Sequence, residues 1–143
     1  MRECDEWFAI AQEDLSSAEF LQGKQPIPIR VICFHCQQAA EKMLKGFLST
    51  QQAEPKKIHD LIILCKDCCE FDDGFEQLMD ACSELTDYGV QTRYPYELDL
   101  NEQDMQSALQ HAYAIRDFVE CIMMQENEDE TESFDGQGFE QSM

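Results

Sequence analysis

The residues of this chain that could do chemistry form a set of polar and aromatic side chains suited to a nucleotide. Lys45 and Arg93 could bind phosphate, because both cations donate hydrogen bonds to phosphate oxygens. Tyr94 could stack on a base, and Gln38 could hydrogen-bond to its edge. We therefore predict a ligand-binding set of Gln38, Glu41, Lys45, His59, Arg93 and Tyr94.

The same residues also have a purely structural interpretation. Glu41 and Lys45 are four residues apart, in the order that favours an ion pair along one helix face. His59, followed by Asp60, could simply begin a helix, and Arg93 could attach its loop to an earlier helix through Glu41. The sequence leaves both interpretations open and assigns no catalytic residue to this set.

Two pairs of cysteines have the spacing of some zinc sites: Cys33 with Cys36, and Cys65 with Cys68. Structural zinc sites usually place such pairs on tight turns, whereas these pairs fall at apolar positions of predicted amphipathic helices. A free thiol in such a position behaves as a small hydrophobic side chain. We therefore expect reduced core cysteines and no metal, with zinc as the alternative.

A central helix over residues 29–51 is predicted to organise the chain. Its apolar side chains recur at steps of three and four residues, the period of an α-helix with a broad buried face. These apolar positions are Ile32, Cys33, Cys36, Ala39, Ala40, Met43, Leu44, Phe47 and Leu48.

Four further helices are predicted over residues 3–22, 57–70, 73–89 and 101–124. Asp73 and Glu76 have the spacing of a capping box, and Asn101 can cap the last helix. No segment alternates as a strand does, so we expect an all-α, up-and-down bundle. This bundle would form one domain over residues 1–124, and residues 125–143 would form a disordered acidic tail.

The charge of the chain limits the partners that it can bind. Thirty Asp and Glu residues against ten Lys and Arg residues give a formal net charge of −20. Because nucleic-acid backbones are bound largely through cations, we expect no general binding to DNA or duplex RNA. No apolar run is long enough for a membrane span and no signal peptide is visible, so we expect a cytoplasmic protein that does not enter membranes.

Four short segments occur in an order that resembles the HEPN family of small helical domains. They are residues 11–15 (AQEDL), 38–45 (QAAEKMLK), 59–61 (HDL) and 93–95 (RYP). Each segment alone is common in helical proteins, but the four in this order are much more specific. The resemblance extends over residues 7–122.

The resemblance implies a bundle of four long helices plus a short fifth, usually paired as a homodimer. HEPN proteins are often encoded beside a minimal nucleotidyltransferase, as two halves of a toxin–antitoxin or nucleotide-handling pair. The expectation is therefore a non-catalytic protein that binds a nucleotide, with or without Mg²⁺, or a nucleotidyltransferase partner, or both.

A ribonuclease branch of the HEPN family uses an Arg followed four to six residues later by a His. Such a pair could clamp phosphate and act as acid or base in RNA cleavage. Arg93 occupies the expected place, but no His follows it at that spacing, whereas Arg30 and His35 have the spacing on the central helix instead. A metal-independent ribonuclease toxin using Arg30 and His35, or Arg93 with His59, is one alternative. A purely structural interaction module is the other.

Overall fold

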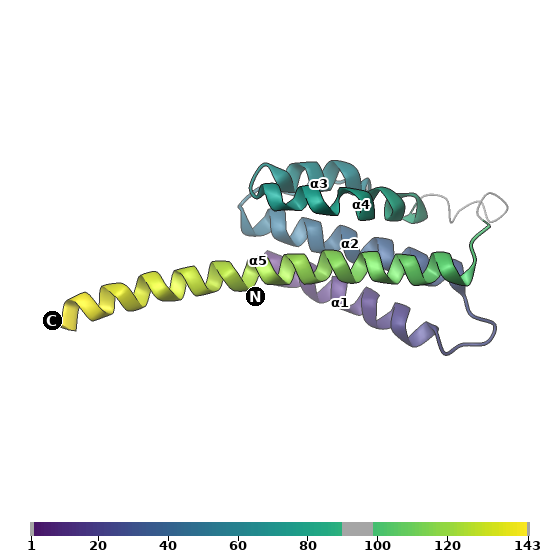
Figure 1. The fold of residues 1–143 in the computed structure, drawn as a ribbon, viewed down its shortest axis with the longest axis horizontal. Coiled ribbons are helices and arrows are strands. Elements are labelled where there is room, and N and C mark those ends of the chain that lie inside the picture. The colour runs from purple at the N-terminus through teal and green to yellow at the C-terminus, as the bar shows by residue number, and fades with distance from the viewer. Residues whose placement is uncertain (1, 90–98, 143) are drawn as a thin grey trace.

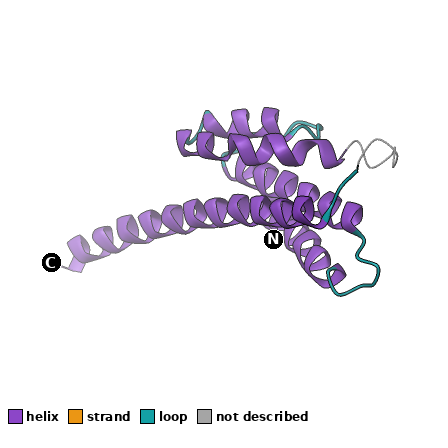
Figure 2. Ribbon diagram, turned by 45° about the vertical axis from the view of Figure 1, so that its right-hand side comes forward, coloured by secondary structure: helices purple, strands orange, loops and turns teal. Residues whose placement is uncertain are grey.

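The computed structural model describes the backbone of residues 2–89 and 99–142, and the side chains of these residues up to position 126. The described residues form helices and no strand (Figures 1 and 2), which confirms the predicted all-α bundle. The elements are α1 (Glu3–Leu21), α2 (Ile29–Thr50), α3 (Leu61–Cys69), η1 (Asp73–Leu78), α4 (Met79–Thr86), η2 (Asp87–Gly89) and α5 (Glu102–Ser142), where η denotes a 3₁₀ helix.

The central helix of the bundle is α2, which contacts α1, α3, α4 and α5. Every apolar position predicted for it is buried, so the predicted core face is confirmed. Gly46 of α2 lies against the ring of Phe8 from α1, and a Cβ atom at Gly46 would overlap that ring. The absence of a side chain at this position therefore lets α1 approach α2 closely.

Three aromatic rings connect α2, η1 and α5. The ring of Phe75 lies 4.6 Å from that of Phe47 and 4.9 Å from that of Phe118, measured between ring centres. Phe47 and Phe75 are both almost completely buried. These contacts anchor the segment between α3 and α4 to the rest of the core.

The predicted start of the third helix at residue 57 is wrong, because α3 begins at Leu61. The carboxylate of Asp60 accepts hydrogen bonds from the backbone N–H groups of Ile62 (2.9 Å) and Ile63 (3.3 Å), and this N-cap ends the preceding extended segment. The N–H of Leu61 donates to the hydroxyl of Thr86 in α4 (2.9 Å). Tertiary and capping contacts therefore set the boundary that periodicity alone could not locate.

The segment predicted as one helix over residues 73–89 is divided into η1, α4 and η2. The cap is Asp72 rather than Asp73: its carboxylate accepts from the N–H of Gly74 (2.9 Å). This local turn competes with a regular first helical turn, so the segment enters α4 through a 3₁₀ helix. Helix α4 is consequently short, and α3 is short as well.

Helix α5 begins at the predicted cap and continues past the predicted end of the bundle. Asn101 and Asp104 exchange hydrogen bonds between side chain and backbone (2.8 and 2.9 Å). The backbone is helical through Ser142, where the composition predicts disorder, and this extension projects beyond the other helices (Figure 1). Its Glu and Gln residues propagate a helix that the bundle has already nucleated. No described helix is both long and apolar enough to cross a membrane.

Candidate functional site

The polar residues of α2 lie against the segment that leads into α3. Gln37, Glu41 and Lys45 are spaced four residues apart, so their side chains share one face of the helix. They are only 0%, 1% and 6% exposed, respectively. Buried polar groups of this kind need partners, because an unpaired charge in a protein interior is costly.

Glu41 is the residue through which the charged groups of this face are paired. Its Oε2 atom lies 3.3 Å from the Nζ atoms of both Lys42 and Lys45, and its Oε1 atom lies 2.8 Å from Nδ1 of His59. Lys42 also donates to Oε1 of Gln38 at 2.8 Å. One buried carboxylate therefore joins two lysines and one histidine from two segments of the chain.

Gln37 contacts the backbone of His59, whereas Glu41 contacts its ring. Its Nε2 atom donates to the backbone carbonyl of His59 (3.1 Å), and its Oε1 atom accepts from Gln38 (2.7 Å). Gly89 packs so closely that a Cβ atom there would lie 2.7 Å from the Gln37 side chain. We call these residues the α2–His59 network: Gln37, Gln38, Glu41, Lys42, Lys45 and His59.

The electrostatic balance of this network keeps Glu41 ionised. Burial opposes ionisation, but the hydrogen bond to His59 and the positive charges of Lys42 and Lys45 outweigh it, so the pKa of the Glu41 carboxyl lies below its usual value. Two ammonium groups stand against one carboxylate. The network is therefore a locally cationic part of a chain with a net charge of −20.

Lys45 is held inside the protein. Its Nζ atom lies 5.6 Å from the centre of the Trp7 ring on α1, a cation–π distance, and its side chain is 7% exposed. His59, in contrast, has a side chain that is 68% exposed. Lys45 therefore neutralises Glu41 inside the protein, whereas His59 is the member of the network whose side chain is exposed to solvent.

The structure brings four of the six predicted ligand-binding residues together: Gln38, Glu41, Lys45 and His59. The predicted Glu41–Lys45 ion pair is present. Arg93 and Tyr94 lie outside the described residues. Sequence reasoning left Gln37 and Lys42 out of the set, although the position of Gln37 one turn before Glu41 is a usable signal.

His59 borders a shallow surface cleft of about 390 Å³. The cleft is lined by Ile58, His59, Asp60, Ile63, Thr86 and Asp87. Its surface thus combines aliphatic side chains, two carboxylates, a hydroxyl and an imidazole. Such a surface can accept hydrogen bonds from hydroxyl groups and cover the face of a flat ring.

The sequence of the chain was compared with models of known protein families. The family model of the HEPN domain matches residues 4–122. The chain belongs to the HEPN family. A search of curated protein sequences finds no match.

Two solved structures resemble this HEPN chain. One is TT1696 from Thermus thermophilus, with 29% sequence identity and a TM-score of 0.74, over 84% of this chain and 98% of that chain. The other is ST0689, described as an archaeal HEPN homologue, with 25% identity and a TM-score of 0.66, over 84% of this chain and 97% of that chain. Both similarities support the HEPN fold.

The pair with the spacing of HEPN ribonucleases, Arg30 and His35, lies on α2. A separation of five residues turns the two side chains about 140° apart around the helix axis. Nδ1 of His35 lies 2.9 Å from Oδ1 of Asp14 on α1. Within this chain, His35 thus faces a carboxylate of the α1–α2 interface, and the helix geometry directs Arg30 elsewhere.

All eight cysteines are free thiols in the structure, and six of them are buried, whereas Cys69 is half-buried and Cys121 is exposed. Burial raises the pKa of Cys33 to about 11 and that of Cys36 to about 12, which keeps both as thiols. Cys65 donates to the backbone carbonyl of Phe75 at 3.2 Å, and Cys68 to that of Leu44 at 3.6 Å. The described residues contain no group of three or more ligands that could hold a metal, so the zinc alternative finds no site there.

Proposed function

We propose that this HEPN protein is a non-catalytic binding module and that it binds a nucleotide at the His59 cleft. The observation that carries this proposal is the position of His59, which is exposed in the cleft and attached to the buried Glu41. Because Glu41 engages Nδ1, the imidazole is fixed in orientation and presents its Nε2 atom to a ligand.

The lining of the cleft suits the nucleoside part of such a ligand. Ile58 and Ile63 offer apolar surface to a base, and Ile63 is substantially exposed. Asp60 and Asp87 can accept hydrogen bonds from ribose hydroxyls, as acidic residues do in other nucleotide sites. The imidazole of His59 can contribute a further hydrogen bond.

The phosphates of a nucleotide would be repelled by the two carboxylates of the cleft, so positive charge is needed to offset this repulsion. Mg²⁺ is commonly held by one or two carboxylates together with phosphate oxygens, so the proposed ligand is a nucleotide with Mg²⁺. The excess positive charge of the α2–His59 network adds to this compensation. We assign to Arg93 and Tyr94 the phosphate and base contacts that their chemistry allows.

A thermal-shift screen with nucleoside mono-, di- and triphosphates, each with and without Mg²⁺, tests the nucleotide proposal. A ligand at one hundred times its dissociation constant adds about 2.7 kcal/mol to stability, which shifts the melting temperature by several degrees. The shift should disappear in His59→Ala and persist in His111→Ala, since His111 pairs with Glu84 outside the cleft. A flat screen would refute nucleotide binding.

We propose that the protein also forms a homodimer. Phe20 is 84% exposed, and Ile10 and Val31 on the same helical hairpin are also exposed. Exposed apolar residues of this size often mark an interface. Light scattering at micromolar concentration should give the mass of a dimer, and Phe20→Glu should reduce it to that of a monomer. A monomeric mass for the unmodified chain would contradict the proposal.

The proposed biological partner is a minimal nucleotidyltransferase, with the two proteins forming a toxin–antitoxin-type pair. The HEPN family membership supports this part of the proposal. Co-purification of the chain with a minimal nucleotidyltransferase encoded beside it should give a stable complex. Separate elution of the two proteins on gel filtration would contradict this pairing.

A further inference from the structure

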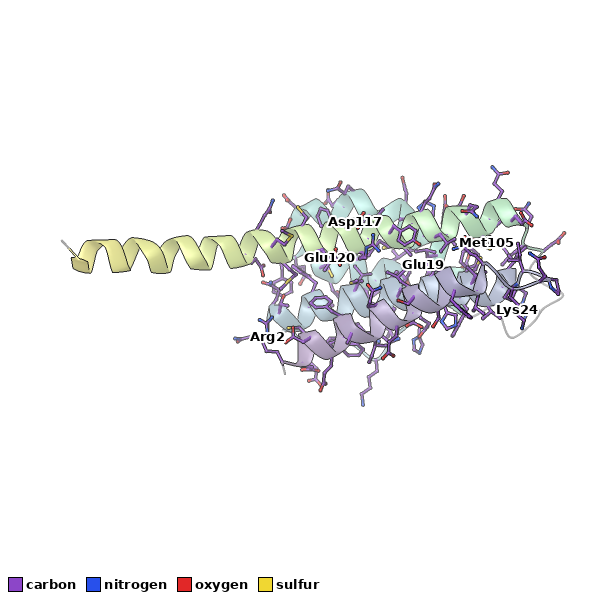
Figure 3. The ribbon with its side chains drawn as sticks, turned by 90° about the horizontal axis from the view of Figure 1, so that it is seen from below. Arg2, Glu19, Lys24, Met105, Asp117 and Glu120 are labelled. Carbon is purple, nitrogen blue, oxygen red and sulfur yellow. The ribbon has the colours of Figure 1, made fainter. Side chains whose placement is uncertain are left out.

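An apolar groove lies between α1 and α5, on the opposite side of α2 from the His59 network. It has a volume of about 530 Å³. Its apolar lining comes from Phe8 and Ala9 of α1, Met43 of α2, and Val119, Met123 and Met124 of α5. Figure 3 shows α1 and α5 side by side, with Arg2 at one end of α1 and Glu120 on α5. The groove shares no lining residue with the His59 cleft.

Met123 and Met124 give the outer part of this groove an adaptable surface, whereas Met43 is buried beneath them. Three of the chain's seven methionines line it, and Met124 is 63% exposed. Methionine side chains are flexible and polarizable, so they accommodate apolar partners of varied shape. At the rim, Arg2 is paired with Asp5 at 3.4 Å, and Glu120 adds a negative charge.

The groove adjoins a long anionic helix. Met123 and Met124 line the groove, and α5 still contacts the end of α2 at Glu126, whose Oε1 atom accepts a hydrogen bond from Gln51 (3.1 Å). Farther along the chain, α5 projects beyond the other helices (Figures 1 and 2). Residues 125–143 contain seven acidic residues and no basic residue. Along this one helix, the residues that line the groove are thus followed by a segment whose sequence is strongly acidic.

We propose that the α1–α5 groove binds a basic amphipathic helix of another protein. The apolar face of that helix packs on the methionines, as in other helix-in-groove complexes. Its Lys and Arg residues lie along the acidic extension of α5, where charge complementarity orients the helix and accelerates its association. This site is independent of the proposed nucleotide cleft.

Methyl-selective NMR of the full chain with ¹³C-labelled methionines tests the proposal. The probe is a synthetic helical peptide of Leu and Lys with one apolar face, compared with a matched peptide in which Glu replaces Lys. The Lys peptide should shift the methyl signals of Met43, Met123 and Met124 in a saturable way. The signals of Met79 and Met105, which do not line the groove, should stay in place.

Two exposed apolar residues give matched variants. Met124→Glu should weaken binding of the Lys peptide about tenfold. Phe71→Glu adds the same charge outside the groove, at a residue that is also exposed, and should change the affinity less than about twofold. Replacing Glu128, Glu130 and Glu132 with Gln should weaken binding and reduce its dependence on salt.

Three results would overturn the proposal. Equal shifts of all methionine signals, or equal effects of Met124→Glu and Phe71→Glu, would mean that the peptide acts only as a counter-ion. If the Glu peptide bound as tightly as the Lys peptide, charge complementarity could not explain the binding. Shifts of Met43, Met123 and Met124 with protein concentration alone would identify the groove as an interface between copies of this chain.

Discussion

The two faces of α2 differ in what they bury and what they expose. Glu41 and Met43 are two residues apart and thus about 200° apart around the helix axis. On the Glu41 side, charged groups are buried, and each has a partner within the α2–His59 network. On the Met43 side, an apolar groove remains open between α1 and α5.

This difference separates a structural role from a binding role. Buried charges are stable only when they neutralise one another, so we infer that most of the α2–His59 network serves the fold and that the proposed ligand meets only its exposed His59 end. The apolar groove, in contrast, has buried core residues such as Met43 and Val119 in its lining and the mostly exposed Met124 at its surface. Its exposed surface is of use when a partner covers it.

The largest effect is expected from Glu41→Ala, which removes the centre of the network. Lys45 would be left buried beside Trp7 without its carboxylate, which costs about 3–5 kcal/mol. Urea unfolding of the variant measures this cost. Asp117→Ala is the control: it removes a surface ion pair with Arg116 and should cost less than about 1 kcal/mol. Equal costs for the two variants would mean that the network does not stabilise the fold.

A smaller effect is expected from Gly46→Ala at the α1–α2 contact. The added methyl group overlaps the ring of Phe8, which also lines the groove, and overpacking of this kind costs about 1–3 kcal/mol. Gly23→Ala is the matched control, since a Cβ there has only an ordinary contact with a backbone oxygen. Thermal unfolding of both variants measures the difference, and an unchanged melting temperature for Gly46→Ala would contradict the close packing.

The pH dependence of stability should report the charge of Glu41. Its folded pKa is below the usual 4.5, so the ionised carboxylate stabilises the fold above pH 4.5, and this contribution is lost as the pH falls through the folded pKa. The difference in unfolding free energy between the unmodified chain and Glu41→Gln should therefore be largest near neutral pH and shrink as the pH falls through the folded pKa of Glu41. A difference that stays constant into acid would contradict this assignment.

The smallest effect on stability is expected from Met124→Glu. Because Met124 is mostly exposed in the open groove, the substitution should change the unfolding free energy by less than about 0.5 kcal/mol. Urea unfolding measures this change. A loss above about 2 kcal/mol would mean that Met124 belongs to the packed core rather than to an available surface.

The apolar pattern of the sequence is sufficient to predict the bundle. The buried face of α2 follows directly from residues that recur at helical spacing, and the cap at Asn101 follows from its side chain. The start of α3 was not predictable from periodicity, because it depends on the Asp60 cap and on the contact between Leu61 and Thr86. The helical backbone of residues 125–142 was likewise not indicated by an acidic composition.

The candidate site was predictable in its residue types but not in its roles. A sequence cannot show that Lys45 lies beneath Trp7 or that Lys42 shares the same carboxylate oxygen, because these contacts depend on how α1 packs on α2. The role of Gln37 depends in the same way on Gly89, which is far away in the chain. Local spacing therefore identified the carboxylate–lysine pair, and tertiary packing determined that both of its members are buried while His59 reaches the surface.

NMR of the histidine side chains during a titration with ATP and Mg²⁺ is the most direct test of nucleotide binding at the His59 cleft. The chain has three histidines, and each lies beside a different carboxylate: His35 with Asp14, His59 with Glu41, and His111 with Glu84. We expect the ring signals of His59 to shift while those of His35 and His111 remain in place. Unchanged signals for His59, or shifts at His35 instead, would contradict it.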